Sequence, residues 1–269
     1  MSAFREQVAA LTGTSPERIE RLAGGDLSEV VLLRRADGRC TVAKYNKAAA
    51  VEAAMLRALA EAGAPTPAIE GEFDNVLLLE QVENDGVFSP AAWRAIGTLL
   101  RHLHRPLDEP YGWAVDYQLG SVTLPNRRTY DWPVFWGEQR LIAVAAILDR
   151  PLRERVSALA KRLAAHLPSR PPSVLLHGDL WSGNILVADG RLAALIDPAC
   201  YYGDPEVDLA MLDLFDTPPE EFWQAYGHLP DAWEQRRPLY QLFPALVHLR
   251  LFGASYAGLV ERLLEQAGA

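Results

Sequence analysis

The strongest constraint on the fold and chemistry of this chain comes from residues 175–184, which read LLHGDLWSGN. Asp179 precedes Asn184 by five residues, and Asp197 follows one predicted hairpin later. Phosphoryl transfer from a nucleotide needs such a set, because one carboxylate accepts the proton of the attacking hydroxyl while an amide oxygen and a second carboxylate hold divalent metal on the phosphates. The pattern predicts a kinase in which Asp179 is the catalytic base and Asn184 and Asp197 are the metal ligands.

Charge and cysteine content narrow the possible partners and compartment. The 269 residues include 35 acids against 26 Lys and Arg, a formal net charge of −9 that would repel nucleic acid. The two cysteines, Cys40 and Cys200, suit neither a metal cluster nor a disulfide framework and indicate the reducing cytoplasm. The N-terminus lacks a signal-peptide pattern, and the longest apolar run, 141–148, is too short to span a bilayer. We expect a cytoplasmic protein that binds neither nucleic acid nor membrane.

A phosphate-binding turn is predicted near the N-terminus. After a short helix, strand signals cover residues 18–23, 29–35 and 39–45. Gly24 and Gly25 connect the first two strands, and they permit positive φ and a close approach of backbone amides to a phosphate. An ordinary turn is the alternative explanation for two adjacent glycines. The two glycines alone are a weak signal. We predict that they contact the nucleotide because the downstream motif is also present.

A lysine and a glutamate upstream match the same chemistry. Lys44 lies on the third strand, and Glu52 lies early in an Ala-rich helix predicted over 48–62. Kinase folds pair a strand lysine with a helix glutamate to aim an ammonium at the nucleotide phosphates. Taken alone, either residue is equally well explained as a solvated surface charge. Lys47 and Glu61 lie nearby and are alternative candidates for the same two roles. Because the downstream motif is present, we expect Lys44 to bind phosphate with Glu52 as its partner.

The boundary between two lobes is predicted just after an apolar strand at 76–80. Glu80, Gln81 and Val82 lead out of it, and in a two-lobed kinase the adenine hydrogen-bonds to backbone groups of this connector. These three residues are therefore cofactor-contact candidates. The fold is predicted to be α+β and two-lobed. A small nucleotide-binding lobe with an antiparallel sheet and a helix spans 1–82, and a larger, mainly helical lobe with the catalytic loop, metal site and acceptor site spans 83–269.

Helical periodicity dominates the second predicted lobe. Helices are expected over 89–104, 131–148, 152–167 and, with a kink or break at Pro244, over 220–266. The segment 105–130 has no clear periodicity and is expected to be a loop that shapes the acceptor site. Trp132, Phe135 and Trp136 form an aromatic stripe that favours core packing over substrate contact. His177 and Asp208 are expected to brace or cap the catalytic loop rather than to react.

Seven runs of residues carry a resemblance to one known family. They are 177–184 (HGDLWSGN), 197–199 (DPA), 201–210 (YYGDPEVDLA), 111–113 (YGW), 116–120 (DYQLG), 125–126 (PN) and 135–141 (FWGEQRL). The chain resembles, over essentially its whole length, the fructosamine kinase or ketosamine-3-kinase family within the aminoglycoside-phosphotransferase-like kinases, which share a protein-kinase-like fold. Trp181 is the sharpest discriminator, because relatives with other substrates commonly carry different residues there.

The resemblance implies ATP- and Mg²⁺-dependent transfer of the γ-phosphoryl group to the 3-hydroxyl of a ketosamine, the rearranged adduct of a sugar with an amine. The product would eliminate and free the amine, which amounts to deglycation. By position, Asp179 resembles the catalytic base, Asn184 and Asp197 the metal ligands, and Lys44 and Glu52 the phosphate-binding pair. The segment 24–28 resembles the nucleotide-covering loop. Three positions depart from the family pattern. Asp26 occupies about the position at which some members have a redox-active cysteine. Asp204 stands where the family pattern has a histidine, and residues 114–115 stand where it has a His-containing loop.

Two alternatives to a ketosamine kinase remain at this stage. One is a kinase for another small hydroxyl compound, such as an aminoglycoside, choline or a sugar derivative. The other is a catalytically silent, kinase-like binding module, against which the joint presence of Lys44, Asp179, Asn184 and Asp197 argues. The sequence leaves open the sugar of the acceptor, whether its amine is free or protein-bound, and the oligomeric state.

Overall fold

The computed structural model describes residues 18–22, 29–34 and 38–269 and divides into two compact units. Unit 1 comprises the described part of Met1–Ala92 together with Gly183–Pro198, and unit 2 comprises Trp93–Ser182 and Ala199–Ala269. Residues 83–92 and the hairpin around Asn184 thus group with the N-terminal unit. The division into lobes at 82/83 stays a prediction. The predicted N-terminal helix, Gly24, Gly25 and Asp26 lie outside the described residues.

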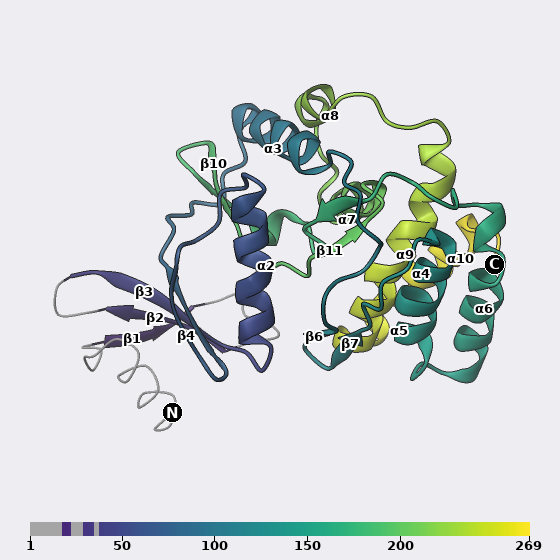
Figure 1. Ribbon diagram of the computed structural model, residues 1–269, viewed down its shortest axis with the longest axis horizontal. Helices are drawn as coiled ribbons and strands as arrows, with labels where there is room; N and C mark the ends of the chain where they lie inside the picture. The colour runs from purple at the N-terminus through teal and green to yellow at the C-terminus, as the bar shows by residue number, and fades with distance from the viewer. Residues whose placement is uncertain (1–17, 23–28, 35–37) are drawn as a thin grey trace. The chain divides into compact units, whose positions relative to one another are not determined.

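Unit 1 is built on a five-stranded antiparallel sheet (Figure 1). Its strands lie in the order β1 (Arg18–Arg21), β2 (Glu29–Arg34), β3 (Cys40–Tyr45), β5 (Val76–Glu80) and β4 (Ile69–Phe73). The strand predictions for β1, β2, β3 and β5 are confirmed. β4 is not indicated by its sequence, IEGEF, because two glutamates and a glycine interrupt any apolar alternation.

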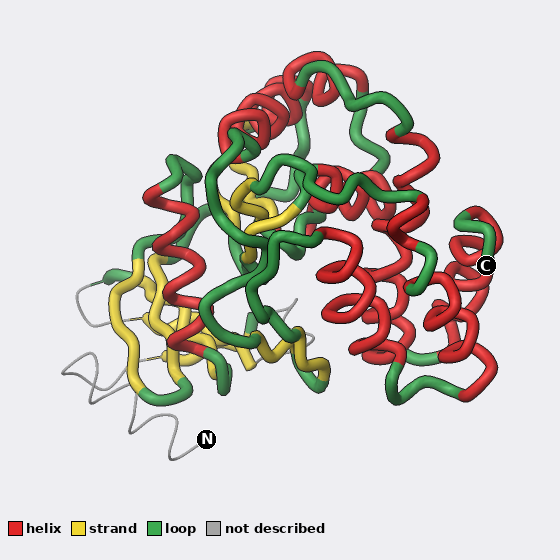
Figure 2. Tube along the Cα trace, turned by 45° about the vertical axis from the view of Figure 1, so that its right-hand side comes forward, coloured by secondary structure: helices red, strands yellow, loops and turns green. Residues whose placement is uncertain are grey.

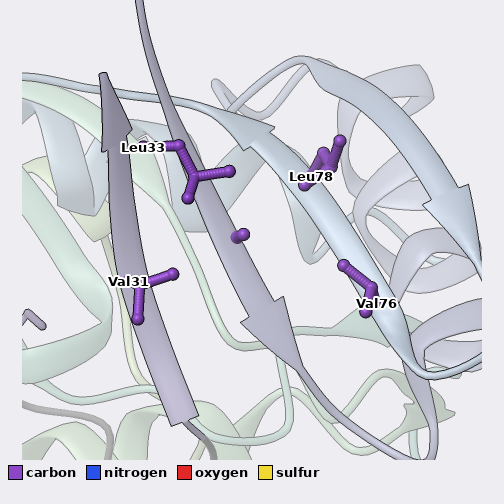
Figure 3. Close-up of a cluster of buried hydrophobic side chains, with 5 residues drawn as sticks. Val31, Leu33, Val76 and Leu78 are labelled. Carbon is purple, nitrogen blue, oxygen red and sulfur yellow. The ribbon is translucent and has the colours of Figure 1, made fainter. Parts of the chain in front are cut away.

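The two faces of this sheet bury different side chains, because successive residues of a strand point to opposite sides. One face carries a buried cluster made of Val31, Leu33, Ala43, Val76 and Leu78 (Figure 3). On the other face Leu77 and Leu79 pack against helix α2 (Ala49–Glu61), and Val42 of β3 joins them. Lys44 follows Val42 by two residues along β3, so its side chain points to the α2 side of the sheet.

A hairpin far along the chain completes unit 1. Strands β9 (Ile185–Ala188) and β10 (Arg191–Leu195) pair antiparallel, as predicted, and are joined by Asp189 and Gly190, both at positive φ as a tight hairpin turn requires. The connector after β5 holds this hairpin, since the Asp85 amide donates to the Val187 carbonyl at 2.9 Å. The Ser89 hydroxyl also donates to the Gly190 carbonyl at 2.6 Å while capping the next helix.

Unit 2 is mainly helical (Figure 2). Helix α3 (Pro90–Leu103) leads into it from unit 1. Its further elements are β6 (Tyr117–Leu119), β7 (Val122–Leu124), α4 (Trp132–Trp136), α5 (Ala143–Ala145), α6 (Arg150–Ala160), β8 (Val174–Leu176), β11 (Tyr201–Gly203), α7 (Glu206–Asp216), α8 (Glu220–Tyr226), α9 (Trp233–Phe252) and α10 (Ala257–Gln266). No helix in the described ranges is both long enough and apolar enough to cross a bilayer.

Several expectations about unit 2 need correction. The helix expected over 152–167 ends at Ala160, and the one expected over 220–266 is three helices, α8, α9 and α10. The segment 105–130 is not only loop, because β6 and β7 form a small hairpin within it. The helix expected over 131–148 contains a π-helical turn, Gly137–Ile142, between α4 and α5. A break at Pro244 is wrong, because α9 continues through both Pro238 and Pro244. Every residue from 238 to 247 is buried, so packing against neighbouring elements offsets the backbone hydrogen bonds that the prolines remove.

The aromatic stripe lies in the core of unit 2, as predicted. Trp132, Phe135 and Trp136 are each completely buried. The Trp132 indole donates to the Tyr240 hydroxyl at 2.9 Å, and the Trp136 indole donates to the Leu239 carbonyl at 3.1 Å. Both polar ring groups therefore keep a partner inside the core, which removes the cost of burying them unpaired.

Candidate active site

Three predicted site residues meet in unit 1. The Lys44 ammonium lies 2.8 Å from a carboxylate oxygen of Glu52 and 2.8 Å from a carboxylate oxygen of Asp197. Lys44 reaches Glu52 because α2 packs on the face of the sheet to which the Lys44 side chain points, and it reaches Asp197 because the hairpin belongs to the same unit. Lys44 is only 6% exposed. Because water cannot solvate its ammonium fully, the two carboxylates stabilise the charge instead.

Glu52 is completely buried and has a second partner that sequence reasoning missed. The Asn46 side-chain amide donates to the other Glu52 carboxylate oxygen at 2.6 Å, and the Asn46 oxygen accepts from the Ala48 amide at 2.9 Å. Burial raises the pKa of the Glu52 carboxyl, and the nearby Lys44 ammonium opposes that rise. Asn46 therefore ties the start of α2 to the glutamate that holds Lys44 in place.

The two predicted metal ligands flank the β9–β10 hairpin. Ile185 pairs with Leu195, and the Ile196 amide donates to the Asn184 carbonyl at 3.0 Å, so Asn184 and Asp197 lie at one edge of the hairpin. Asp197 adopts a φ of +54°, a left-handed conformation that is uncommon for a residue with a side chain but that aspartate adopts more readily than most residues. Its side chain is 39% exposed, whereas the Lys44 side chain is 7% exposed.

Amide and carboxylate oxygens at this edge suit Mg²⁺, which prefers oxygen ligands and is commonly bound by one or two protein groups together with substrate phosphates. No cluster of three or more His, Cys, Asp or Glu side chains able to hold a metal occurs in the part of the chain that the structure describes. Asn184 and Asp197 therefore fit a metal that a nucleotide's phosphates also coordinate, and do not fit an all-protein cage.

The loop that carries Asp179 lies in unit 2, between β8 and β11. These strands pair antiparallel, and the Ala199 amide donates to the His177 carbonyl at 2.9 Å. Gly178 has φ +79°, and a Cβ there would lie 2.1 Å from the Ala199 carbonyl oxygen, so glycine is required. The Asp179 amide donates to Nδ1 of His177 at 3.3 Å, which leaves the half-buried Asp179 on a tightly held turn.

Asp208 in the first turn of α7 braces this loop, as predicted. Its two carboxylate oxygens accept from the backbone amides of His177 at 2.8 Å and Gly178 at 2.9 Å. Nε2 of His104 lies 3.4 Å from the same carboxylate, and Nδ1 of His104 lies 3.0 Å from the Tyr226 hydroxyl. His104 is thus more than a polar helix end, because it links α3 and α8 to the carboxylate that holds the loop.

Two further residues of unit 2 support the site, and the sequence analysis assigns a role to neither. Asp216, at the end of α7, accepts from the Ser182 amide at 2.7 Å and so fixes the far end of the catalytic loop. Arg140 is completely buried, and its guanidinium donates to the Pro125 carbonyl at 2.6 Å and to the Asn126 side chain at 2.8 Å. It therefore holds the segment that sequence analysis connects with the acceptor.

The remaining predicted nucleotide contacts lie where the strand β5 ends. Glu80 is the last residue of β5, and its amide donates to the Ala68 carbonyl at 2.9 Å. Gln81 and Val82 follow in an irregular segment. The structure does not bring these three side chains into the Lys44 cluster, which agrees with contacts made through backbone groups. Their role, like that of Gly24 and Gly25, stays a prediction.

The predicted site residues thus fall in both units. Unit 1 holds Lys44 and the predicted metal ligands Asn184 and Asp197, and unit 2 holds the predicted base Asp179 on a braced loop. The chain passes from Asp179 in unit 2 to Asn184 in unit 1 within five residues.

Comparisons with known proteins agree on one family. The family model for fructosamine kinase matches residues 1–268. A "probable ketoamine kinase" of Thermus thermophilus is 34% identical over 250 residues, which cover 90% of this chain and 91% of the relative. A crystal structure from Thermobifida fusca, provisionally named a fructosamine-3-kinase, superposes with a TM-score of 0.86 at 28% identity over 99% of both chains.

A more distant structure extends the likeness in fold alone. An aminoglycoside phosphotransferase in a ternary complex with ADP and hygromycin B superposes with a TM-score of 0.67 at 19% identity, over 98% of this chain and 99% of that chain. The predicted α+β, kinase-like fold is confirmed by these structures together with the sheet and helices of the two units.

Proposed function

Since the chain belongs to the fructosamine kinase family, we propose that it transfers the γ-phosphoryl group of ATP to the 3-hydroxyl of a ketosamine. The observation that carries this proposal is the family match over residues 1–268, within which the Lys44, Glu52 and Asp197 cluster is intact. The enzyme is a phosphotransferase with an alcohol group as acceptor. Its substrate would be a small-molecule or protein-bound ketosamine, met in the cytoplasm.

Each residue has a role in the proposed reaction. Asp179 accepts the proton of the attacking hydroxyl, and Lys44, oriented by Glu52, neutralises phosphate charge. Asn184 and Asp197 would hold Mg²⁺, which when bound neutralises charge on the nucleotide's phosphates. Asp197 lies 2.8 Å from the Lys44 ammonium, so the phosphate-binding and metal-binding groups support one another. Because little covalent chemistry falls to the protein, positioning by the braced loop and the buried ion cluster supplies most of the effect.

A panel of acceptors tests the proposed activity directly. Purified protein with Mg·ATP is offered fructosamine and ribulosamine forms of lysine, an aminoglycoside, choline and a free pentose, and ADP release is measured together with the mass of the product. We expect a phosphorylated ketosamine, and no transfer after a chelator removes the metal. Transfer to an aminoglycoside or choline but to neither ketosamine would replace the proposed substrate class, and no turnover on any acceptor would favour a silent binding module.

Replacing the base is the sharpest test of a site residue. Asp179→Asn keeps the shape of the side chain but removes its capacity to accept a proton, so we expect kcat on the best ketosamine to fall by roughly 10²–10⁴-fold. Calorimetric binding of Mg·ATP should persist, because the phosphate and metal groups lie in unit 1. Asp231→Asn, at an exposed position of the same unit as Asp179, is the matched control and should behave as wild type. Near-normal turnover of Asp179→Asn would remove this residue from the reaction.

A further inference from the structure

Five rings form a continuous series in unit 2 that begins beside the catalytic loop. The Trp181 ring lies 6.3 Å, centroid to centroid, from Phe215, and Phe215 lies 4.7 Å from His248. His248 in turn lies 5.3 Å from Phe252 and 5.0 Å from Tyr256. We call this series the aromatic strip. It runs from the residue two positions after Asp179, across the end of α7, to the end of α9 and the turn beyond it.

The strip is exposed at both ends and firmly placed at its start. Trp181 is 38% exposed and Phe252 is 41% exposed, and the rings between them are half-buried. Asp216 accepts from the Ser182 amide at 2.7 Å, which fastens the residue after Trp181 to the residue after Phe215. The Asp216 carboxylate therefore lies beside the first step of the strip, one residue after Phe215 in sequence and hydrogen-bonded to the residue that follows Trp181.

His248 contributes an uncharged ring to this series. Its Nδ1 lies 2.8 Å from the Pro244 carbonyl, and since a carbonyl only accepts, Nδ1 carries the hydrogen and Nε2 keeps its lone pair. Burial lowers the pKa of His248, so the ring is neutral at physiological pH. A neutral imidazole between Phe215 and Phe252 keeps the strip free of positive charge along its length.

We propose that the aromatic strip binds the amine-derived arm of the ketosamine, so that it selects among acceptors that share a sugar but differ in their amine. This inference deepens the proposed function and rests on it. When the sugar hydroxyl is presented to Asp179, the substituted ammonium and its arm extend from the same small molecule, and Trp181 is two residues away. Ring faces attract an ammonium and cover methylene groups, and the Asp216 carboxylate adds attraction for the same charge.

The experiment compares two ketosamines of one sugar that differ only in the arm, one made from methylamine and one made from a long amine that ends in a ring, such as phenylhexylamine, which can reach past Phe215 and His248 toward Phe252. Phe252→Ala removes the exposed far end of the strip, and we expect it to raise the ratio of the long-arm KM to the short-arm KM about threefold to tenfold, the effect of one lost aromatic contact. Phe252→Tyr, which restores a ring face, should return the ratio to that of wild type. Phe73→Ala, which removes an exposed ring of β4 in unit 1, is the matched control and should leave the ratio unchanged.

The outcomes separate the strip from the proposed function. Wild-type turnover of the short-arm ketosamine supports the function whatever the strip does. An unchanged KM ratio in Phe252→Ala overturns the strip alone, and no turnover of either ketosamine by wild type overturns both. Sedimentation measured at assay concentration is a further test. If wild type is a dimer and Phe252→Ala is a monomer, the strip contacts a second copy of the chain, and the proposal that it binds the acceptor is overturned.

Discussion

At the scale of single residues, Gly178 shows how tightly the catalytic loop is determined. Gly178→Ala would combine a positive φ with a Cβ placed 2.1 Å from the carbonyl oxygen of Ala199, in the segment that precedes β11. We expect this variant to lose about 2–5 kcal/mol of unfolding free energy, the sum of left-handed strain and overpacking. Urea denaturation measures the loss.

The control for Gly178 is a glycine with the same backbone but open surroundings. Gly86 has φ +69° and nothing within 4 Å of an added Cβ, so Gly86→Ala should lose only about 1–2 kcal/mol, the strain alone. Equal losses in the two variants would mean that the contact with Ala199 is not what requires glycine at 178.

The same scale shows what sequence reasoning can and cannot find. Lys44, Glu52 and Asp197 are identifiable because phosphoryl transfer demands their charges, and the structure brings the three together. Asn46 and Arg140 are not identifiable, because their roles depend on hydrogen-bond partners that only folding brings near. An asparagine after a strand and an arginine in a helix are ordinary residues in a sequence. The roles of Asp179 and the metal ligands stay predictions until variants are measured.

At the scale of elements, α7 is the part that holds the catalytic loop. Its Asp208 accepts two backbone amides, which an asparagine cannot do, because an amide group has one oxygen and its NH₂ would face a second donor. Asp208→Asn should therefore leave a buried amide unpaired, lower stability by about 1–3 kcal/mol and lower kcat about tenfold or more by loosening the loop.

The readout that separates this role from general destabilisation is nucleotide binding. Because the Lys44 cluster lies in unit 1, Asp208→Asn should still bind Mg·ATP in calorimetry at temperatures where it remains folded. Asp213→Asn changes another acid of the same helix, one paired with Arg237 and Gln241, and should retain kcat. If the two variants lose activity equally, the loop-bracing role of Asp208 is not what sets turnover.

Elements were predictable where one physical signal dominated. The β9–β10 hairpin has a strong turn signal, Asp189-Gly190, between two apolar runs, and its position is confirmed. β6 and β7 have three residues each, too few for alternation to be recognised. Helix α9 continues through two prolines because its burial outweighs a local rule, and burial is a property of the packed fold that no single segment reveals.

At the scale of the whole molecule, Asp204 makes stability depend on pH. Burial, followed by the nearby Glu206 carboxylate, raises the pKa of Asp204 from its ordinary 3.8 to about 7. The folded protein therefore binds this proton more readily than the unfolded chain does. The stability it contributes is present in full below about pH 4 and is lost as the pH rises through 7. The hydroxyl of Tyr240, which donates to Asp204 at 2.7 Å, remains a partner throughout.

We expect wild type to lose roughly 2 kcal/mol of unfolding free energy between pH 5 and pH 8 that Asp204→Asn does not lose, because asparagine has no proton to release in that range. Urea titrations of both proteins at each pH measure the difference in slope, which is independent of any constant cost of the substitution. Asp108→Asn, at an exposed acid, should keep the wild-type slope. Parallel slopes for wild type and Asp204→Asn would show that Asp204 does not change its protonation state between pH 5 and pH 8.

The discontinuity of unit 1 has a consequence for how the protein is made. The segment Trp93–Ser182 is inserted between the two parts of this unit, so a nascent chain cannot complete it until residue 198 has left the ribosome. Until then Lys44 has only one of its two carboxylate partners, and a large loop must close before the second arrives. A fragment ending at Ala92 would therefore not be a separable nucleotide-binding domain, and co-translational folding of this unit has to wait for most of the polypeptide.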